Sequence, residues 1–358
     1  MPSSTANLLI KKDDLNMKQM WWKILGVLIL LYVLTVGMLM PLKPGIVDIS
    51  GFQTKAGTTK TYDIKGYNTH YLAANTYAWL KLDENNLLLA NTQAHTDTEL
   101  SATFDIPLSF PAKGSNHEMT LITYNKADGP AVLPGAVIVT DVIETDTDWP
   151  AMDLSMITDL PGMQFPYRST LNETIRNTFF HIPLWFSMLI LLLAGLWYSV
   201  RYLRGRSMND DIMASSLTTV AILFGMLGIV TGSIWARFTW GAWWSPDVKL
   251  NMSATAMLIY CAYIVLRSSV ADRDRKAQLS AAYSIFAFVA LIPLIFVIPR
   301  LTDSLHPGNG GNPALGGEDM ENTLRMVFYP AIIGFTLLGL WIATLVIRYK
   351  RLVERRYE

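Results

Sequence analysis

The fold is decided by residues 212–234, IMASSLTTVAILFGMLGIVTGSI, a stretch without a single charged side chain. An apolar run of this length is what a helix needs to cross the roughly 30 Å hydrocarbon core of a bilayer. Five further runs of the same character occur at residues 24–42, 179–200, 252–266, 279–298 and 327–347. The sequence therefore predicts a polytopic α-helical membrane protein with six transmembrane helices.

The composition agrees with a membrane protein. Hydrophobic residues make up 51% of the chain and charged residues only 16%, against roughly 25% charged in a typical soluble domain. Lys plus Arg and Asp plus Glu both number 29, so there is no basic excess to bind nucleic acid. A single cysteine, Cys261, excludes an internal disulfide and CxxC chemistry.

Basic residues are placed beside alternate ends of the runs. They lie at residues 11–23, 201–206, 267–276 and 348–356. Because Lys and Arg near helix ends stay on the cytoplasmic side, we expect a cytoplasmic segment at 1–23 and a basic cytoplasmic tail at 348–358. The connections 43–178, 235–251 and 299–326 then face outward. The first run is too long for a cleavable signal peptide and is interpreted as a retained anchor.

The outward segment 43–178 is long enough to form a domain of its own. Its short apolar runs are separated by turn-rich stretches such as DENN at 83–86 and DGP at 128–130. Such spacing is typical of strands. We expect an inserted all-β domain between the first two helices, folded as a small β-sandwich. The remaining part, 179–347, is predicted to be a five-helix membrane domain.

Two histidines and a tryptophan cluster stand out on the predicted outward side. His181 lies in FFHIP at the start of the second run, and His306 lies in SLHPG after the fifth. Between them, residues 235–249, WARFTWGAWWSPDVK, contain four Trp. An aromatic belt at the membrane interface explains one or two of these rings. Four rings interrupted by Gly241 also suit a flat surface for a planar ligand, and both interpretations stay open at this point.

The two histidines suggest which planar ligand the aromatic surface could hold. An isolated histidine at a helix end is more often an interface residue, but two imidazoles flanking an aromatic surface are what bis-histidine haem ligation requires. A cation such as Lys249, Arg237 or Arg300 can then pair with the haem propionates.

The stretch GSIWARFTWGAWWSPDVKL at 232–250 resembles the tryptophan-rich WWD signature of the cytochrome c maturation haem-handling family, CcmC. The HIP motif at 181–183 and the LHPG motif at 305–308 are similar to the family's two histidine motifs. The resemblance implies that His181 and His306 are the axial ligands of haem iron. It further implies a haem-holding role for Trp235, Arg237, Trp240, Gly241, Trp243, Trp244, Asp247 and Lys249.

Three departures from the family pattern are visible. Pro246 stands where members usually have another Trp before the Asp, and Lys249 stands where they tend to have Arg. Lysine keeps the positive charge but lacks the bidentate fork of arginine. The large β domain is also absent from the compact family form.

The resemblance implies a chaperone without catalytic turnover that takes up haem b non-covalently and transiently. The expected location is a bacterial inner membrane, with the haem site and the β domain periplasmic. The expected partners are a CcmE-like haem chaperone, the ABC transporter subunits CcmA and CcmB, and a small CcmD-like membrane protein. The alternatives are a haem lyase of the WWD family that acts directly on apocytochrome c, and a haem-free scaffold or permease subunit.

Overall fold

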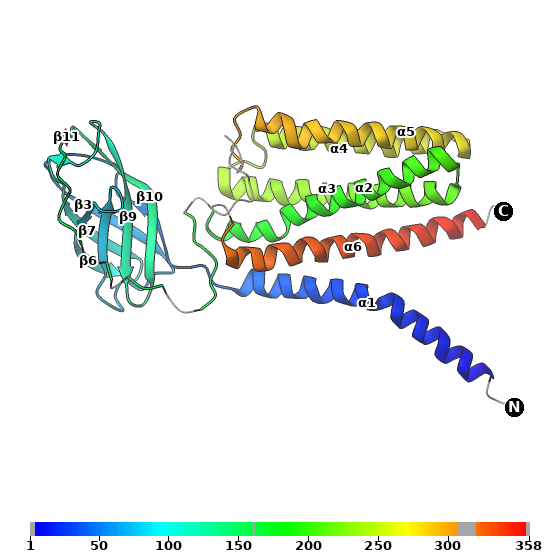
Figure 1. Ribbon diagram of the computed structural model, residues 1–358, viewed down its shortest axis with the longest axis horizontal. Coiled ribbons are helices and arrows are strands. Elements are labelled where there is room, and N and C mark those ends of the chain that lie inside the picture. The colour runs from blue at the N-terminus through cyan, green and yellow to red at the C-terminus, as the bar shows by residue number, and fades with distance from the viewer. Residues whose placement is uncertain are drawn as a thin grey trace. The chain divides into compact units, whose positions relative to one another are not determined.

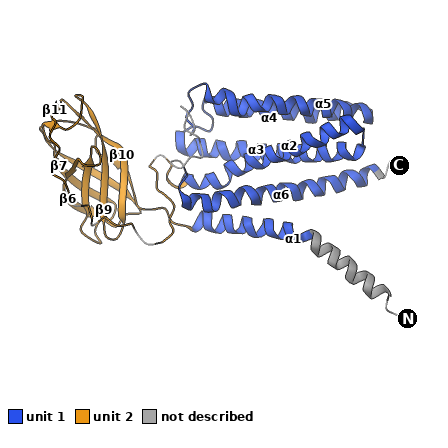
Figure 2. Cartoon of the chain, in the orientation of Figure 1, with its two compact units in different colours: residues 1–39, 174–358 blue, residues 40–173 orange. Residues whose placement is uncertain are grey.

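The computed structural model describes residues 4–306 and 320–355 apart from 153, 156, 160, 161 and 170, with backbone alone at 4–19 and 355. The chain divides into two compact units (Figure 2). A helical unit comprises Met1–Leu39 and Thr174–Glu358, and a β unit comprises Met40–Glu173. Each unit has its own hydrophobic core.

Within the described residues, six helices are long and apolar enough to span a membrane. They are α1 (Ser4–Leu39), α2 (His181–Gly205), α3 (Met208–Trp240), α4 (Val248–Ser269), α5 (Arg273–Ile292) and α6 (Asn322–Arg355), as Figure 1 shows. A 3-10 helix, η1 (Asn172–Phe179), precedes α2. Together with the β unit between α1 and α2, they confirm the predicted fold class.

Several helix ends differ from the sequence-based boundaries. The first helix ends at Leu39 and not at Leu42. The third helix continues to Trp240, so residues 235–240 belong to α3 and not to the predicted loop. It ends there because Gly241 adopts φ +80°, a left-handed conformation that glycine accommodates readily. The connection between α3 and α4 is therefore only residues 241–247.

The end of the fifth run is irregular. The α-helix stops at Ile292, and Pro293 begins a π-helical turn, η2 (Pro293–Val297), followed by the 3-10 turn η3 (Ile298–Arg300). Proline lacks the N–H that the regular helical ladder needs, so a change of register at this residue has a clear cause. The irregular segment turns Leu294 and Ile295 toward the functional site described below.

The helical core lies where α2 packs against α3, α5 and α6. Leu191 of α2, Phe224 of α3 and Ala343 of α6 are buried there. At one end of the unit, Arg267 of α4 forms a bidentate ion pair with Asp211 of α3, with N–O distances of 2.7 and 2.8 Å. Arginine and carboxylate match in this geometry, so the pair fixes α4 against the start of α3.

The β unit contains the strands β1 (Gly45–Ile49), β2 (Gln53–Lys55), β3 (Thr59–Tyr67), β4 (Tyr77–Lys81), β5 (Leu87–Leu89), β6 (Asn91–Thr96), β7 (Glu99–Asp105), β8 (Ser109–Phe110), β9 (His117–Asn125), β10 (Gly129–Thr140) and β11 (Ile143–Glu144).

Two sheets make up most of the β unit, one ordered β1-β3-β7-β6 and the other β2-β10-β9-β4-β5. Most pairs are antiparallel, as in the hairpin of β9 and β10. Tyr62 and Phe104 of the first sheet share one core with Leu80 and Leu121 of the second. Burial of alternate residues from both sheets is the packing of a β-sandwich.

Candidate functional site: two histidines in a tryptophan-lined pocket

His181 is the first residue of α2, and its ring is held by α3. Its Nδ1 lies 3.0 Å from the Gly228 carbonyl oxygen and 3.2 Å from the Thr231 hydroxyl oxygen. A carbonyl only accepts hydrogen bonds, so Nδ1 carries the proton and donates it. The neutral imidazole then keeps the lone pair on Nε2. His181 therefore presents a nitrogen that can bind a metal.

Glycines of α3 make room for this ring and its neighbour. A Cβ at Gly232 would lie 2.6 Å from His181 Cε1, and a Cβ at Gly228 would lie 2.8 Å from Trp185 Cε2. Small residues four positions apart on one helix face allow close approach of a neighbouring helix. Here Gly232 and Gly228 leave room for the side chains of His181 and Trp185 to pack against the α3 backbone.

His306 lies in the connection after η3, and its ring is held by Asp247. The distance from His306 Nδ1 to Asp247 Oδ1 is 3.1 Å. The imidazole is 20% exposed and the carboxylate 1%. Burial lowers the pKa of His306 below its ordinary value, although Asp247 opposes that shift. A neutral ring that donates Nδ1–H to a carboxylate again leaves Nε2 as the free nitrogen.

Asp247 connects two segments, the start of α4 and the segment that carries His306. It caps α4 by accepting the Lys249 amide at 2.8 Å and the Leu250 amide at 3.4 Å. Its Oδ2 accepts the Leu305 amide at 2.7 Å. Burial alone favours the protonated acid, but hydrogen bonds from Ser304, Leu305 and Lys249 and the proximity of His306 hold the pKa of Asp247 below its usual value. The carboxylate is thus ionised near neutral pH.

Tryptophan rings stand edge-on to both imidazoles. The ring centroids of Trp235 and His181 are 5.7 Å apart with planes at 75°, and those of Trp240 and His306 are 4.8 Å apart at 70°. Both tryptophans lie in the last turns of α3. Edge-to-face contacts of this kind fix the orientation of a ring.

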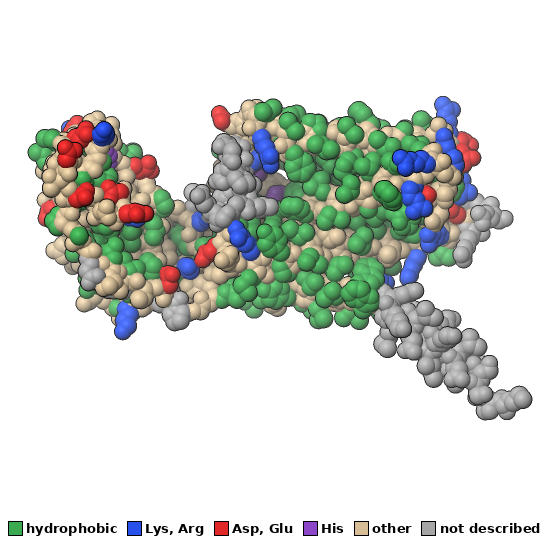
Figure 3. Space-filling view, viewed as in Figure 1, with side chains coloured by type: hydrophobic (Ala, Val, Ile, Leu, Met, Phe, Trp, Pro, Cys, Tyr) green, Lys and Arg blue, Asp and Glu red, His purple; other side chains and the backbone are tan. Residues whose placement is uncertain are grey.

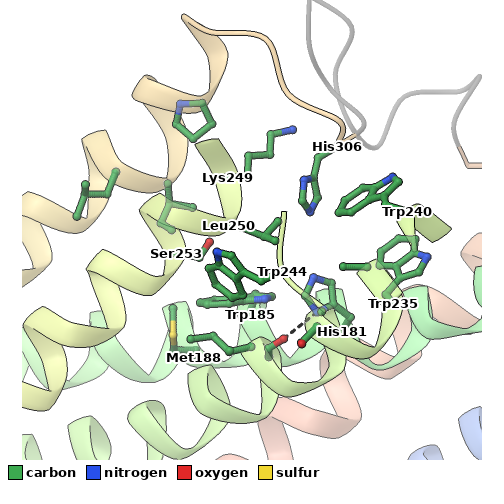
Figure 4. Close-up of a pocket in the computed structure, with 18 of the residues that line it drawn as sticks. His181, Trp185, Met188, Trp235, Trp240, Trp244, Lys249, Leu250, Ser253 and His306 are labelled. Carbon is green, nitrogen blue, oxygen red and sulfur yellow. Dashed lines mark hydrogen bonds between the residues drawn. The ribbon is translucent and has the colours of Figure 1, made fainter. Parts of the chain in front are cut away.

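These side chains enclose one pocket of the helical unit, with a cavity volume of about 200 Å³. Figure 4 shows His181 from below and His306 from above directed into the same space. In Figure 3, histidine lies at the bottom of a hollow that adjoins an apolar face. Of the predicted site residues, the structure brings together His181, His306, Trp235, Trp240, Trp244 and Lys249 as pocket lining.

The other four predicted residues do not line this pocket. Trp243 is 59% exposed, and its carbonyl accepts the Ser233 hydroxyl at 2.7 Å. The Arg237 guanidinium donates to the Gly241 carbonyl and so closes the end of α3. Asp247 supports His306 from behind. These four residues lie outside the pocket lining, and their haem-holding role stays a prediction.

Several residues that line the pocket were not predicted from the sequence. Trp185 follows His181 by one helical turn, and its ring lies edge-on to the imidazole at 6.4 Å. The i to i+4 spacing places both on one helix face and is the signal that identifies it. Met188 and Ser253 also line the pocket, as does Leu294, whose position depends on the π-helical turn and has no sequence signal.

Comparison with known proteins assigns the helical part. The family model described as Heme exporter protein C matches residues 151–358. The chain is 27% identical to Heme exporter protein C of Paracoccus denitrificans over 183 residues, which cover 51% of this chain and 75% of the relative. It is 25% identical to the Escherichia coli K12 protein of the same name over 195 residues, 51% and 74% of the two chains.

A shorter similarity points to a second group of proteins. The Cytochrome c biogenesis protein CcsA of a Synechococcus species is 32% identical over 84 residues, which cover 24% of this chain and 26% of the relative.

Proposed function

The chain belongs to the Heme exporter protein C family, and from this premise we propose that it binds haem and passes it on during the maturation of c-type cytochromes. The observation that carries the proposal is the pair His181 and His306. Both rings line one pocket, and both have Nδ1 engaged by an acceptor and Nε2 left for iron. The names of the relatives support haem as the ligand.

The donor set suits haem better than a bare ion. Two imidazoles from separate elements are an incomplete shell for a free metal, but they complete the axial positions of iron that a porphyrin already holds. Bound haem would contribute these two open positions, and the protein would contribute neutral imidazoles. The ligand is proposed to be haem b, held without a covalent bond.

The aromatic walls supply the remaining contact. Trp185, Trp235, Trp240 and Trp244 line the pocket beside the histidines. Such rings bury much apolar surface and prefer defined relative orientations, which suits a large planar ligand. Lys249, half-buried in the pocket lining, is the cation proposed for a haem propionate, with Arg300 as an accessory. Arg237 is not proposed for a propionate, because its guanidinium donates a hydrogen bond to the Gly241 carbonyl.

The site is proposed to face the periplasm across a bacterial inner membrane. Figure 3 shows Lys and Arg gathered at the end of the helical unit opposite the hollow with the histidines. Basic residues mark the cytoplasmic side, which supports the proposal that both termini are cytoplasmic. The proposed haem acceptor is a CcmE-like chaperone, and CcmA, CcmB and a CcmD-like protein are proposed to complete the assembly. The chain is proposed to act as a transfer chaperone without catalytic turnover.

A second candidate function is direct attachment of haem to apocytochrome c by a lyase of the WWD type. The similarity to a Cytochrome c biogenesis protein favours it. That similarity covers only a quarter of this chain, whereas the family match covers more than half. Incubation of the haem-loaded protein with either an apo haem chaperone or apocytochrome c separates the two functions by which acceptor gains haem.

Absorption spectra of the detergent-purified protein test the proposed ligands. We expect a low-spin bis-histidine spectrum, oxidised and after dithionite reduction, that is lost in His181→Ala and in His306→Ala. His95→Ala is the control, because His95 lies in the β unit and bonds Ser101. Equal haem content in all three variants would contradict the ligand assignment. A wild-type protein that fails to bind added haemin would favour a haem-free scaffold.

A further inference from the structure

The two pocket histidines have hydrogen-bond acceptors of different charge. The acceptors of His181 Nδ1 are neutral, a backbone carbonyl and a hydroxyl at 3.0 and 3.2 Å. The acceptor of His306 Nδ1 is the carboxylate of Asp247 at 3.1 Å. The carboxylate is 1% exposed, so water screens its charge only weakly.

We infer that Asp247 is a positioning residue that makes His306 the stronger axial ligand and biases the site toward ferric haem. The inference rests on the proposed haem site and adds the preferred oxidation state of the iron. A carboxylate that accepts the Nδ1 proton of an imidazole raises the basicity of the opposite nitrogen. A more basic ligand and a nearby negative charge both stabilise the more positive iron.

The hydrogen bonds of Asp247 explain how the charge is kept in place. The carboxylate also accepts the amides of Lys249, Leu250 and Leu305. These bonds come from the start of α4 and from the His306 segment, so the carboxylate is fixed relative to the ring. Lys249 lines the same pocket and opposes the negative charge in part, but it does not hydrogen-bond the imidazole in the way Asp247 does.

The test compares Asp247→Asn with Thr231→Val in the full chain. Asparagine caps a helix about as well as aspartate, so Asp247→Asn removes the charge and keeps the α4 cap; thermal unfolding verifies this. Thr231→Val removes the hydroxyl acceptor of His181 and leaves the Gly228 carbonyl. Each protein is titrated with haemin and with dithionite-reduced haem, and the midpoint potential of the loaded protein is measured.

We expect Asp247→Asn to weaken haemin binding by about 10- to 100-fold, to weaken ferrous haem binding less, and to move the midpoint potential to a more positive value. Thr231→Val removes an uncharged acceptor, so it should leave the midpoint potential and the ratio of ferric to ferrous affinity unchanged. An unchanged potential and an unchanged ratio of ferric to ferrous affinity in Asp247→Asn would overturn the inference.

A measurement on the haem-free protein separates this inference from the proposed function. Imidazole ¹⁵N chemical shifts report which ring nitrogen of His306 carries the proton. We expect an Nδ1–H ring in the wild type and an altered ring signal in Asp247→Asn. Identical His306 signals in the two proteins would overturn the role of Asp247, whereas a wild type that binds no haem would overturn the proposed function.

Discussion

The two sides of the pocket hold their histidines in opposite ways. On the α2 side, His181 is fixed by packed helices: its ring lies against Gly232 and donates to a backbone carbonyl. On the loop side, His306 is fixed by one carboxylate from a distant segment, Asp247. The first arrangement depends on the space between helices, and the second depends on one side chain. Substitutions that add volume should therefore damage the first side, and substitutions that remove a hydrogen bond should damage the second.

The largest effect is expected from Gly232→Ala. The added Cβ would lie 2.6 Å from His181 Cε1, so the ring must leave its position. Overpacking of this kind costs about 1–3 kcal/mol of stability, and haem retention should fall nearly as far as in His181→Ala. Thermal unfolding and bound haem after purification measure the two effects.

Gly205→Ala is the matched control for that substitution. A Cβ at Gly205 meets nothing within 4 Å, so the variant should retain haem and stability. Full haem retention in Gly232→Ala would show that the α2 side tolerates added volume, and the comparison between the two sides would fail.

A smaller effect is expected from Asp247→Ala on the loop side. Loss of a helix cap alone costs about 1 kcal/mol, and Asp247 additionally holds Leu305 and His306. Asp272→Ala provides the reference, since Asp272 caps α5 through the Arg275 amide at 2.7 Å. The difference in unfolding free energy between the two variants measures what the hydrogen bonds from Asp247 to Leu305 and His306 contribute. Equal losses would mean that Asp247 is only a cap.

The smallest effect is expected from the tryptophans between the two sides. Trp244 lines the pocket, whereas Trp243 is 59% exposed outside it. Trp244→Ala should weaken haem binding by about 1 kcal/mol, the scale of one aromatic contact. Trp243→Ala should leave the affinity unchanged. Haem titrations of both variants check the assignment, and the reverse order of effects would contradict the lining described above.

The parts of the fold that depend on a local sequence pattern could be predicted from the sequence. Long apolar runs predicted the six helices, and short runs separated by turn residues predicted the β unit. Both signals can be read within a single segment of the chain. The pairing of His181 with His306 could be predicted because the predicted topology puts both residues at the same end of the helices, and the structure finds both lining one pocket.

The remaining features depend on contacts that sequence pattern does not encode. Trp235 and Trp240 were expected in a loop, but Trp and Phe do not end a helix, and α3 continues until Gly241. The sequence also did not show that the Asp247 carboxylate accepts hydrogen bonds from the Leu305 amide and from His306 Nδ1. Those partners lie 58 and 59 residues away along the chain, so no local rule identifies them.

That separation along the chain also sets an order of assembly during synthesis. Translation proceeds from the N-terminus, so the tryptophans of α3 and the capped start of α4 emerge before residue 306 exists. Until α5 has been inserted and the following segment has returned, Asp247 has no imidazole to bind. A nascent chain shorter than 306 residues can therefore display the aromatic surface but cannot bring the two histidines together, so the pocket is completed only late in synthesis.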